Sequence, residues 1–163
     1  MGLDACVFCD CVEKKRLKVP HPYPRLLFIG ENGSPEIRSK VPAKVEAHDE
    51  WMELPPCRHE QMMLDGCGLG SAGFVSIVRD MLAVQEGDYP VLLGRVFYSG
   101  THCGDHLGTR DLRRLAVELD RLEESELLRT ALSGKTAKEI RAVIESLRRT
   151  VTTALSVKKP IAF

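Results

Sequence analysis

The apolar residues of this chain change their spacing along the sequence, and this change limits the fold more than any other feature. In residues 2–12 they alternate, which places Leu3, Ala5 and Val7 on one face of a predicted strand. The apolar run 26–29 precedes a turn rich in glycine and predicts a hairpin. Later in the chain, apolar residues recur every three or four positions, which is the spacing of helices packed on a core.

Three amphipathic helices are expected in the second half of the chain. Their apolar stripes cover residues 74–82, 112–122 and 140–155. A capping box at residues 136–139 opens the third helix, because its threonine and glutamate side chains each satisfy a free backbone donor.

Other segments lack the helical spacing. Residues 91–98 predict another strand, the tail 160–163 predicts a short edge strand, and residues 40–60 predict mostly irregular structure. Strands first and helices later are typical of an α+β fold. We therefore expect one domain over residues 1–163, with a small, largely antiparallel sheet and about three amphipathic helices on one face.

The charge balance argues against two classes of partner. Lys plus Arg equals Asp plus Glu at 23 each, so the chain has no net attraction for nucleic acid or for an acidic membrane. No apolar stretch approaches the ~20 residues that span a bilayer, and charged residues follow the first apolar run too early for a signal peptide. The six cysteines are then expected to be reduced thiols of a cytoplasmic protein.

Cysteines and a histidine in two short segments form a candidate metal site. Cys9 and Cys11 lie two positions apart on a predicted strand, so their side chains point the same way, about 7 Å apart. Cys57 and His59 can supply two further ligands to a tetrahedral zinc ion, with His102 as an alternative imidazole. In the other interpretation these cysteines pack as small apolar side chains.

The segment Tyr98-Ser-Gly-Thr-His-Cys-Gly-Asp-His106 is a second candidate site. His102 and Asp105 are its catalytic candidates, because loops often carry catalytic groups. Together with His106 they can form an open metal site that acidifies a bound water, with Asp105 as ligand or general base. In the alternative, structural interpretation, His102 and Asp105 hydrogen-bond within a tight turn and cap the following helix.

The stretch Gly68-Leu-Gly70-Ser-Ala-Gly73 has the glycine spacing of a dinucleotide-binding fingerprint and opens a predicted helix. That fingerprint also requires a strand directly before the glycines and a parallel βαβ unit. No strand is expected before Gly68. We therefore interpret the glycines as a turn that leads into the helix, and we expect no dinucleotide cofactor.

Three segments of the chain resemble a family of small uncharacterised bacterial proteins. They are the opening Met-Gly-Leu-Asp-Ala-Cys-Val-Phe-Cys-Asp-Cys11, the segment 98–106 and the ending Lys-Lys-Pro-Ile-Ala-Phe163. The resemblance covers most of the chain and implies a bacterial, cytosolic setting. It further implies a role that short proteins often have in that setting, as immunity or accessory proteins in conflict between bacteria or with phage.

We therefore expect a non-catalytic binding protein that neutralises a partner protein, such as a toxin. Trp51, His102 and His106 are the predicted contact residues, from the surface around the tryptophan and from the second candidate loop. The alternative is a metal-dependent enzyme, such as a hydrolase, that uses one of the two segments rich in cysteine and histidine.

Overall fold

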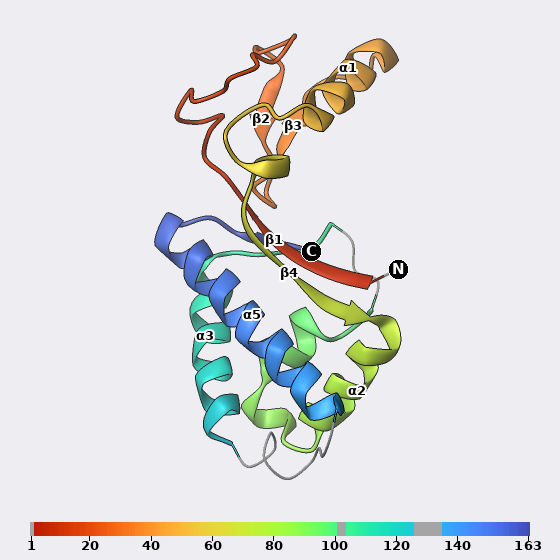
Figure 1. Cartoon of the computed structure of the whole chain (residues 1–163), viewed down its shortest axis with the longest axis vertical. Helices are drawn as coiled ribbons and strands as arrows, with labels where there is room; N and C mark the ends of the chain where they lie inside the picture. Colours follow the sequence, from red (N-terminus) through yellow and green to blue (C-terminus); the bar gives the residue numbers. More distant parts are fainter. Residues whose placement is uncertain (1, 101–103, 126–134) are drawn as a thin grey trace.

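The computed structural model describes residues 2–100, 104–125 and 135–163. Its centre is a four-stranded sheet in the order β4-β1-β6-β5, in which every neighbouring pair is antiparallel. The strands are β1 (Gly2–Phe8), β4 (Met63–Ser71), β5 (His106–Leu107) and β6 (Ile161–Ala162). With helices packed on one face (Figure 1), this architecture confirms the α+β prediction.

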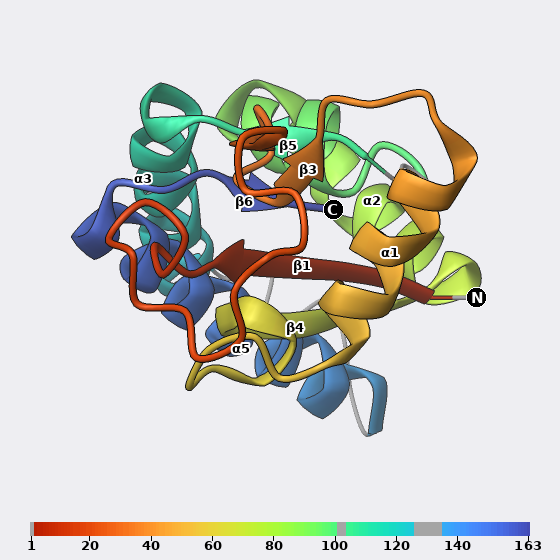
Figure 2. The same cartoon turned by 90° about the horizontal axis from the view of Figure 1, so that it is seen from above.

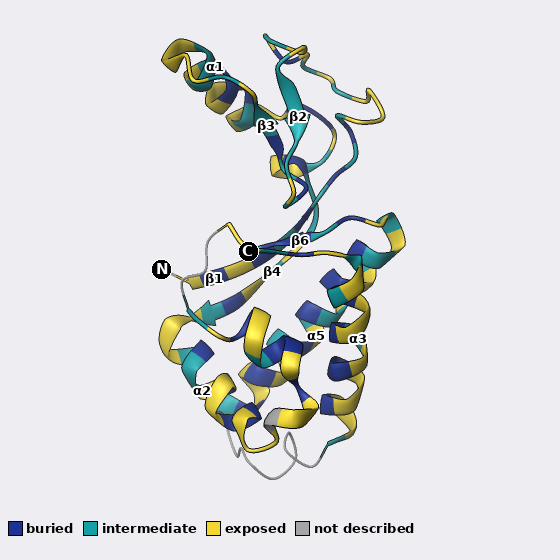
Figure 3. Ribbon diagram, turned by 180° about the vertical axis from the view of Figure 1, so that it is seen from behind, coloured by how far each residue is buried: buried dark blue, intermediate teal, exposed yellow. Residues whose placement is uncertain are grey.

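The helices that cover the sheet are α2 (Ala72–Ala83), α3 (Thr109–Glu124) and α5 (Lys135–Val157). They coincide with the three predicted apolar stripes. Their buried sides face the sheet and one another (Figure 3). Ser71 caps α2, since its hydroxyl oxygen accepts a hydrogen bond from the backbone N–H of Phe74 at 3.3 Å. In the described ranges no helix is both long enough and apolar enough to cross a membrane.

Strand β1 forms over the first part of the segment 2–12 for which the alternation predicted it, and it ends at Phe8, so Cys9 and Cys11 lie beyond the strand and not on it. Leu3, Ala5 and Val7 are each at most 4% exposed and pack into the main core beneath the sheet. Along its length β1 pairs with β4, with two interruptions in register. The sheet therefore places its apolar face on the helices, as the period of two requires.

A long insertion separates the paired strands β1 and β4. It runs from residue 9 to residue 62 and contains the hairpin β2 (Leu27–Ile29) and β3 (Pro35–Ile37), the helix α1 (Pro42–Glu53) and the short 3-10 turn η1 (Glu60–Met62). We call residues 9–62 the inserted module. It stands on the side of the sheet away from the helices (Figure 1, Figure 2).

The inserted module has an apolar cluster of its own and is tied to the C-terminal segment. Trp51 and Met62 pack in this cluster. The buried Lys159 forms an ion pair with Glu13, at the base of the module. Gly33, in the turn of the hairpin, has φ +84° and lies so close to Pro160 that a Cβ would be 3.1 Å from its ring.

The helix α1 was not predicted, because residues 40–60 were expected to be mostly irregular. Pro42 begins the helix, where its missing N–H costs no hydrogen bond. Only His48 and Trp51 are buried along its length. Because so few of its residues are buried, α1 has no apolar stripe, and its sequence therefore did not predict a helix.

The segment 91–98 is also not the strand that its apolar residues predicted. It contains a π-helix at Leu92–Val96. The buried carboxylate of Glu118, on α3, accepts hydrogen bonds from the N–H of Val91 at 2.9 Å and of Leu92 at 2.8 Å, and so satisfies donors at the start of this helical turn. A short buried apolar run has no periodicity that separates strand from helix, and this distant carboxylate decides between them.

Two other expectations about strands are corrected. The tail strand β6 lies inside the sheet between β1 and β5, not at an edge, because both of its sides are paired. Gly68 and Gly70 lie within a strand, β4, which the sequence did not show, and Gly73 lies in the first turn of α2. Since β4 is antiparallel to β1, no parallel βαβ unit is formed with it. Gly70 has φ +107°, and a Cβ there would be 2.5 Å from the Phe74 ring.

Candidate metal centre

Cys9, Cys11, Cys57 and His59 meet at the neck of the inserted module. The first two follow the end of β1, and the last two precede η1 and β4. Because β1 and β4 are paired, the chain that leaves the sheet and the chain that returns to it start side by side. The ligand atoms of the four residues all lie within 4.8 Å of one another, and this is the one group of three or more such side chains found in the described ranges.

Backbone hydrogen bonds hold the two segments of the neck together. The N–H of Cys9 donates to the carbonyl of Met62 at 2.7 Å, and the N–H of Lys18 donates to the carbonyl of Pro56 at 2.7 Å. Gln61 and Met62 have positive φ angles of 47° and 58°, which turn the returning chain into β4. The ligand side chains therefore stand on a closed backbone frame, and not on free loops.

The distances between ligand atoms match those of a tetrahedral zinc site. The Sγ atoms of Cys9 and Cys57 are 3.7 Å apart, and Nδ1 of His59 lies 3.4 Å from Sγ of Cys11 and 3.7 Å from Sγ of Cys57. Around zinc, bond lengths of about 2.3 Å to sulfur and about 2.0 Å to nitrogen give edges of about 3.8 Å between two sulfurs and about 3.5 Å between sulfur and nitrogen. Three edges of the site therefore already have the length that zinc requires.

The surroundings of the site favour bound thiolates. The N–H of His59 donates to Sγ of Cys57 at 3.4 Å, a hydrogen bond that strengthens when the sulfur is negative. Three thiolates around a divalent ion leave one net negative charge. The guanidinium of Arg58 lies beside the site, where its Nε–H donates to Nε2 of His59 at 3.2 Å, and it can offset that charge.

The histidine changes its hydrogen bonding when it binds a metal ion. The bond from Arg58 makes Nε2 of His59 an acceptor, which leaves the proton of the neutral ring on Nδ1. A metal ion on Nδ1 moves that proton to Nε2, so the exposed Arg58 must turn away from it. Binding therefore costs one surface hydrogen bond and one side-chain movement, with no change of backbone.

Burial makes these thiols poor nucleophiles in the absence of an ion. It raises the pKa of Cys9 to about 12 and raises the pKa of Cys11. A thiol with so high a pKa is protonated at neutral pH, and the thiolate is the reactive form. Metal ligation, which removes the proton, is the chemistry that this arrangement supports.

Of the three predicted contact residues, the structure describes Trp51 and His106, and they lie in different parts of the protein. Trp51 is 2% exposed, and its Nε1–H donates to the carbonyl of Val19 at 3.0 Å, so its ring lies inside the module. This corrects the expectation that a surface forms around it, because the narrow buried face of α1 takes the ring. His102 lies outside the described residues. His106 is half-buried on β5, in the body of the protein, by which we mean the central sheet and the helices that cover it.

The second candidate loop is tied to neighbouring elements through Asp105. Its carboxylate accepts a hydrogen bond from the hydroxyl of Tyr98, and its carbonyl accepts one from the N–H of Phe163 at 2.9 Å. The N–H of Gly104 donates to the carbonyl of Phe163 at 2.8 Å, which extends the pairing of β5 with β6. These contacts agree with the structural interpretation of Asp105, whereas its catalytic role stays a prediction.

A pair of buried histidines lies in the inserted module and was missed from the sequence. Nε2 of His21 is 3.1 Å from Nδ1 of His48, and the His21 ring meets Trp51 edge to face at 4.8 Å between centroids. The N–H of Tyr23 donates to Nδ1 of His21 at 2.9 Å. Nε2 of His21 therefore carries the proton and donates to His48. The two histidines are far apart in sequence, and no spacing rule connects them.

Comparison of the chain with protein-family models, with curated proteins and with solved structures found no match. The geometry described above therefore carries the functional argument.

Purified without a metal-affinity column, the protein is expected to contain one zinc ion per chain by elemental analysis. Cys57→Ser removes one of the four ligands, so we expect loss of the zinc and a decrease in the free energy of unfolding of about 3–4 kcal/mol. Cys6→Ser is the matched control: this half-buried cysteine lies on β1, outside the site, and its variant should keep the zinc. Equal zinc content in the two variants, or none in the wild type, contradicts the site.

The histidine pair predicts that stability falls as the pH decreases below about 6.5. Burial lowers the pKa of His21, so below that pH the unfolded chain takes up a proton that the folded chain resists. His21→Asn keeps an acceptor for the Tyr23 N–H but cannot titrate. Thermal unfolding between pH 7.5 and 5.5 should show a smaller loss of stability in this variant than in the wild type, and equal losses would refute the assignment.

Proposed function

We propose that this protein is a non-catalytic binding protein that neutralises a partner protein, and that a structural zinc ion closes its inserted module. The observation that carries the proposal is the ligand set itself. Three cysteines and one histidine supply all four positions of a tetrahedral site, whereas catalytic zinc sites keep one position for water or substrate.

The burial of the site supports a structural role for the ion. Cys9, Cys11 and Cys57 are each at most 2% exposed, and only His59 is half-buried. A substrate would have to displace one of these ligands to reach the metal. The metal-dependent hydrolase that the sequence left as an alternative therefore has no support from this cluster, and the described residues assemble no second group of metal ligands.

The module is the part of the molecule that such an ion would organise. The ion would close a loop of 48 residues between Cys9 and Cys57. A cross-link across a loop of that length adds about 4 kcal/mol to the free energy of unfolding, because it limits the conformations of the unfolded chain. A module held in this way presents a fixed surface to a partner, which lowers the entropy lost on binding. The neutralising role itself comes from the resemblance noted in the sequence.

Replacement of zinc by Co²⁺ separates the structural role from the catalytic one. We expect the visible spectrum of a tetrahedral ion with thiolate ligands, and we expect it to stay unchanged on addition of azide, because no coordination position is open. A band shift or a change of intensity with azide indicates an exchangeable position and supports the hydrolase alternative instead.

Affinity purification of the tagged full chain from its native host tests the binding role. We expect one protein partner at a stoichiometric level, identified by mass spectrometry, and recovered with the Cys6→Ser control. We expect Cys57→Ser to recover less of it, since the module loses its cross-link. The absence of any stoichiometric partner, under conditions that preserve known complexes, contradicts the proposal.

A further inference from the structure

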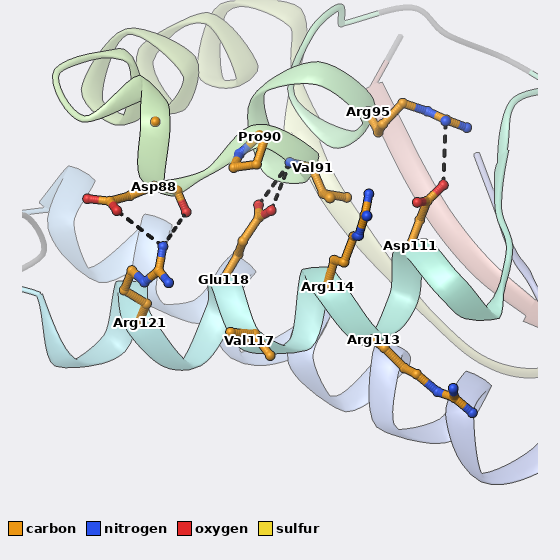
Figure 4. Close-up of a pocket in the computed structure, with 11 residues that line it drawn as sticks. Asp88, Pro90, Val91, Arg95, Asp111, Arg113, Arg114, Val117, Glu118 and Arg121 are labelled. Atoms are coloured by element: carbon orange, nitrogen blue, oxygen red, sulfur yellow. Dashed lines mark hydrogen bonds and ion pairs between the residues drawn. The ribbon is translucent and has the colours of Figure 1, made fainter.

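A groove of about 610 Å³ runs along α3 on the body of the protein, away from the metal site. One wall is α3, and the other is formed by residues 87–95, which lie alongside it (Figure 4). Asp111 stands at one end of the groove and Arg121 at the other. The ten helical steps from Asp111 to Arg121 give a length of about 15 Å, which matches four to five residues of an extended peptide at about 3.3 Å each.

Two arginines of the groove are held in place by carboxylates. Arg95 pairs with Asp111 at 3.5 Å and also donates to the carbonyl of His106 at 3.1 Å. Arg121 donates to the carbonyl and the carboxylate of Asp88 at 3.0 Å and 3.1 Å, through a single nitrogen. Each guanidinium has five N–H donors, so both are fixed in position and keep donors for a ligand.

Two more arginines have no carboxylate partner within the described part of the chain. Arg113 and Arg114 are exposed on α3 and line the groove. Figure 4 shows Arg114 extending from α3 toward Val91, across the groove, while Arg113 extends away from it along the other side of the helix. The free guanidinium of Arg114 therefore lies between the two anchored ones.

The third acidic residue of the groove does not neutralise these cations at its surface. Glu118 is 5% exposed, and its carboxylate is occupied by the backbone N–H groups of Val91 and Leu92. The groove thus has three guanidinium groups at its surface, with that of Arg113 directed away from it, against the two exposed or half-buried carboxylates of Asp88 and Asp111. The chain as a whole has no net charge, so this excess is local.

The lining of the groove also includes apolar side chains. Val117 on α3 is 57% exposed, and Pro90 and Val91 contribute to the other wall. A ligand that matches this pattern has negative charges at its two ends and an aliphatic group between them.

We propose that this groove binds an acidic segment of the partner protein, in which carboxylates flank an aliphatic side chain. The inference rests on the proposed binding role. Arginine favours carboxylates because its planar fork donates two parallel hydrogen bonds to them. The charges at the rim would attract and orient the segment, and the apolar side chains would add contact area.

The probe for this proposal is the capped peptide Glu-Glu-Leu-Glu-Glu, titrated into the isotopically labelled full chain and followed by amide chemical shifts. We expect shifts in α3 and residues 87–95 and an affinity that decreases with salt. Arg113→Glu combined with Arg114→Glu should weaken binding about tenfold. Arg25→Glu, an equal change per residue at an exposed site in the module, should leave it unchanged. Unfolding curves check that each variant is folded.

Three outcomes would overturn the proposal. They are the absence of shifts along α3, equal binding of the neutral peptide Gln-Gln-Leu-Gln-Gln, and shifts along α3 with inorganic phosphate but none with the acidic peptide. The proposed function fails separately. If a partner binds the double variant as tightly as the wild type, the groove is not its binding site, but the proposed binding role stands. If the peptide binds but no partner can be recovered, the groove proposal stands and the proposed function fails.

Discussion

The pairing of β1 with β4 holds both the central sheet and the neck of the inserted module in place. It places Leu3, Ala5 and Val7 over the helices, and it brings together two parts of the chain that the inserted module separates. Closing so long a loop is opposed by chain entropy, which grows slowly with loop length. The pairing overcomes this cost with backbone hydrogen bonds and buried apolar surface. As a consequence, the residues that flank the pair, Cys9 and His59 among them, are brought to one place.

The neck of the module is where a bound ion would affect the stability of the whole inserted module. Without an ion, the module is held by backbone hydrogen bonds at the neck, by its small apolar cluster and by the ion pair of Glu13 with Lys159. These contacts are few for a segment of this size, and small clusters give little stability by themselves. A metal ion at the neck would add a cross-link where the chain enters and leaves, which is the position that constrains the module most.

The body and the module then offer different properties to a partner. The body has a core of its own, in which the buried carboxylate of Glu118 fixes the helical segment after Pro90 and so shapes one wall of the arginine groove. The module has a narrow core, organised around Trp51 and the His21–His48 pair. Burial lowers the pKa of His21, so protonation of this ring at acid pH opposes folding of the module.

The fold class, the three helices on the sheet and the candidate grouping of Cys9, Cys11, Cys57 and His59 could all be predicted from the sequence. These follow from local spacing, since a period of two or of 3.6 records which side of an element is buried. Four features could be seen only in the folded chain. The four candidate ligands come together, Trp51 turns inward, the tail joins the middle of the sheet, and a carboxylate 27 residues away binds the start of the helical segment Leu92–Val96. Each of these depends on a contact between residues far apart in the chain, and periodicity within one segment contains no information about its distant partner.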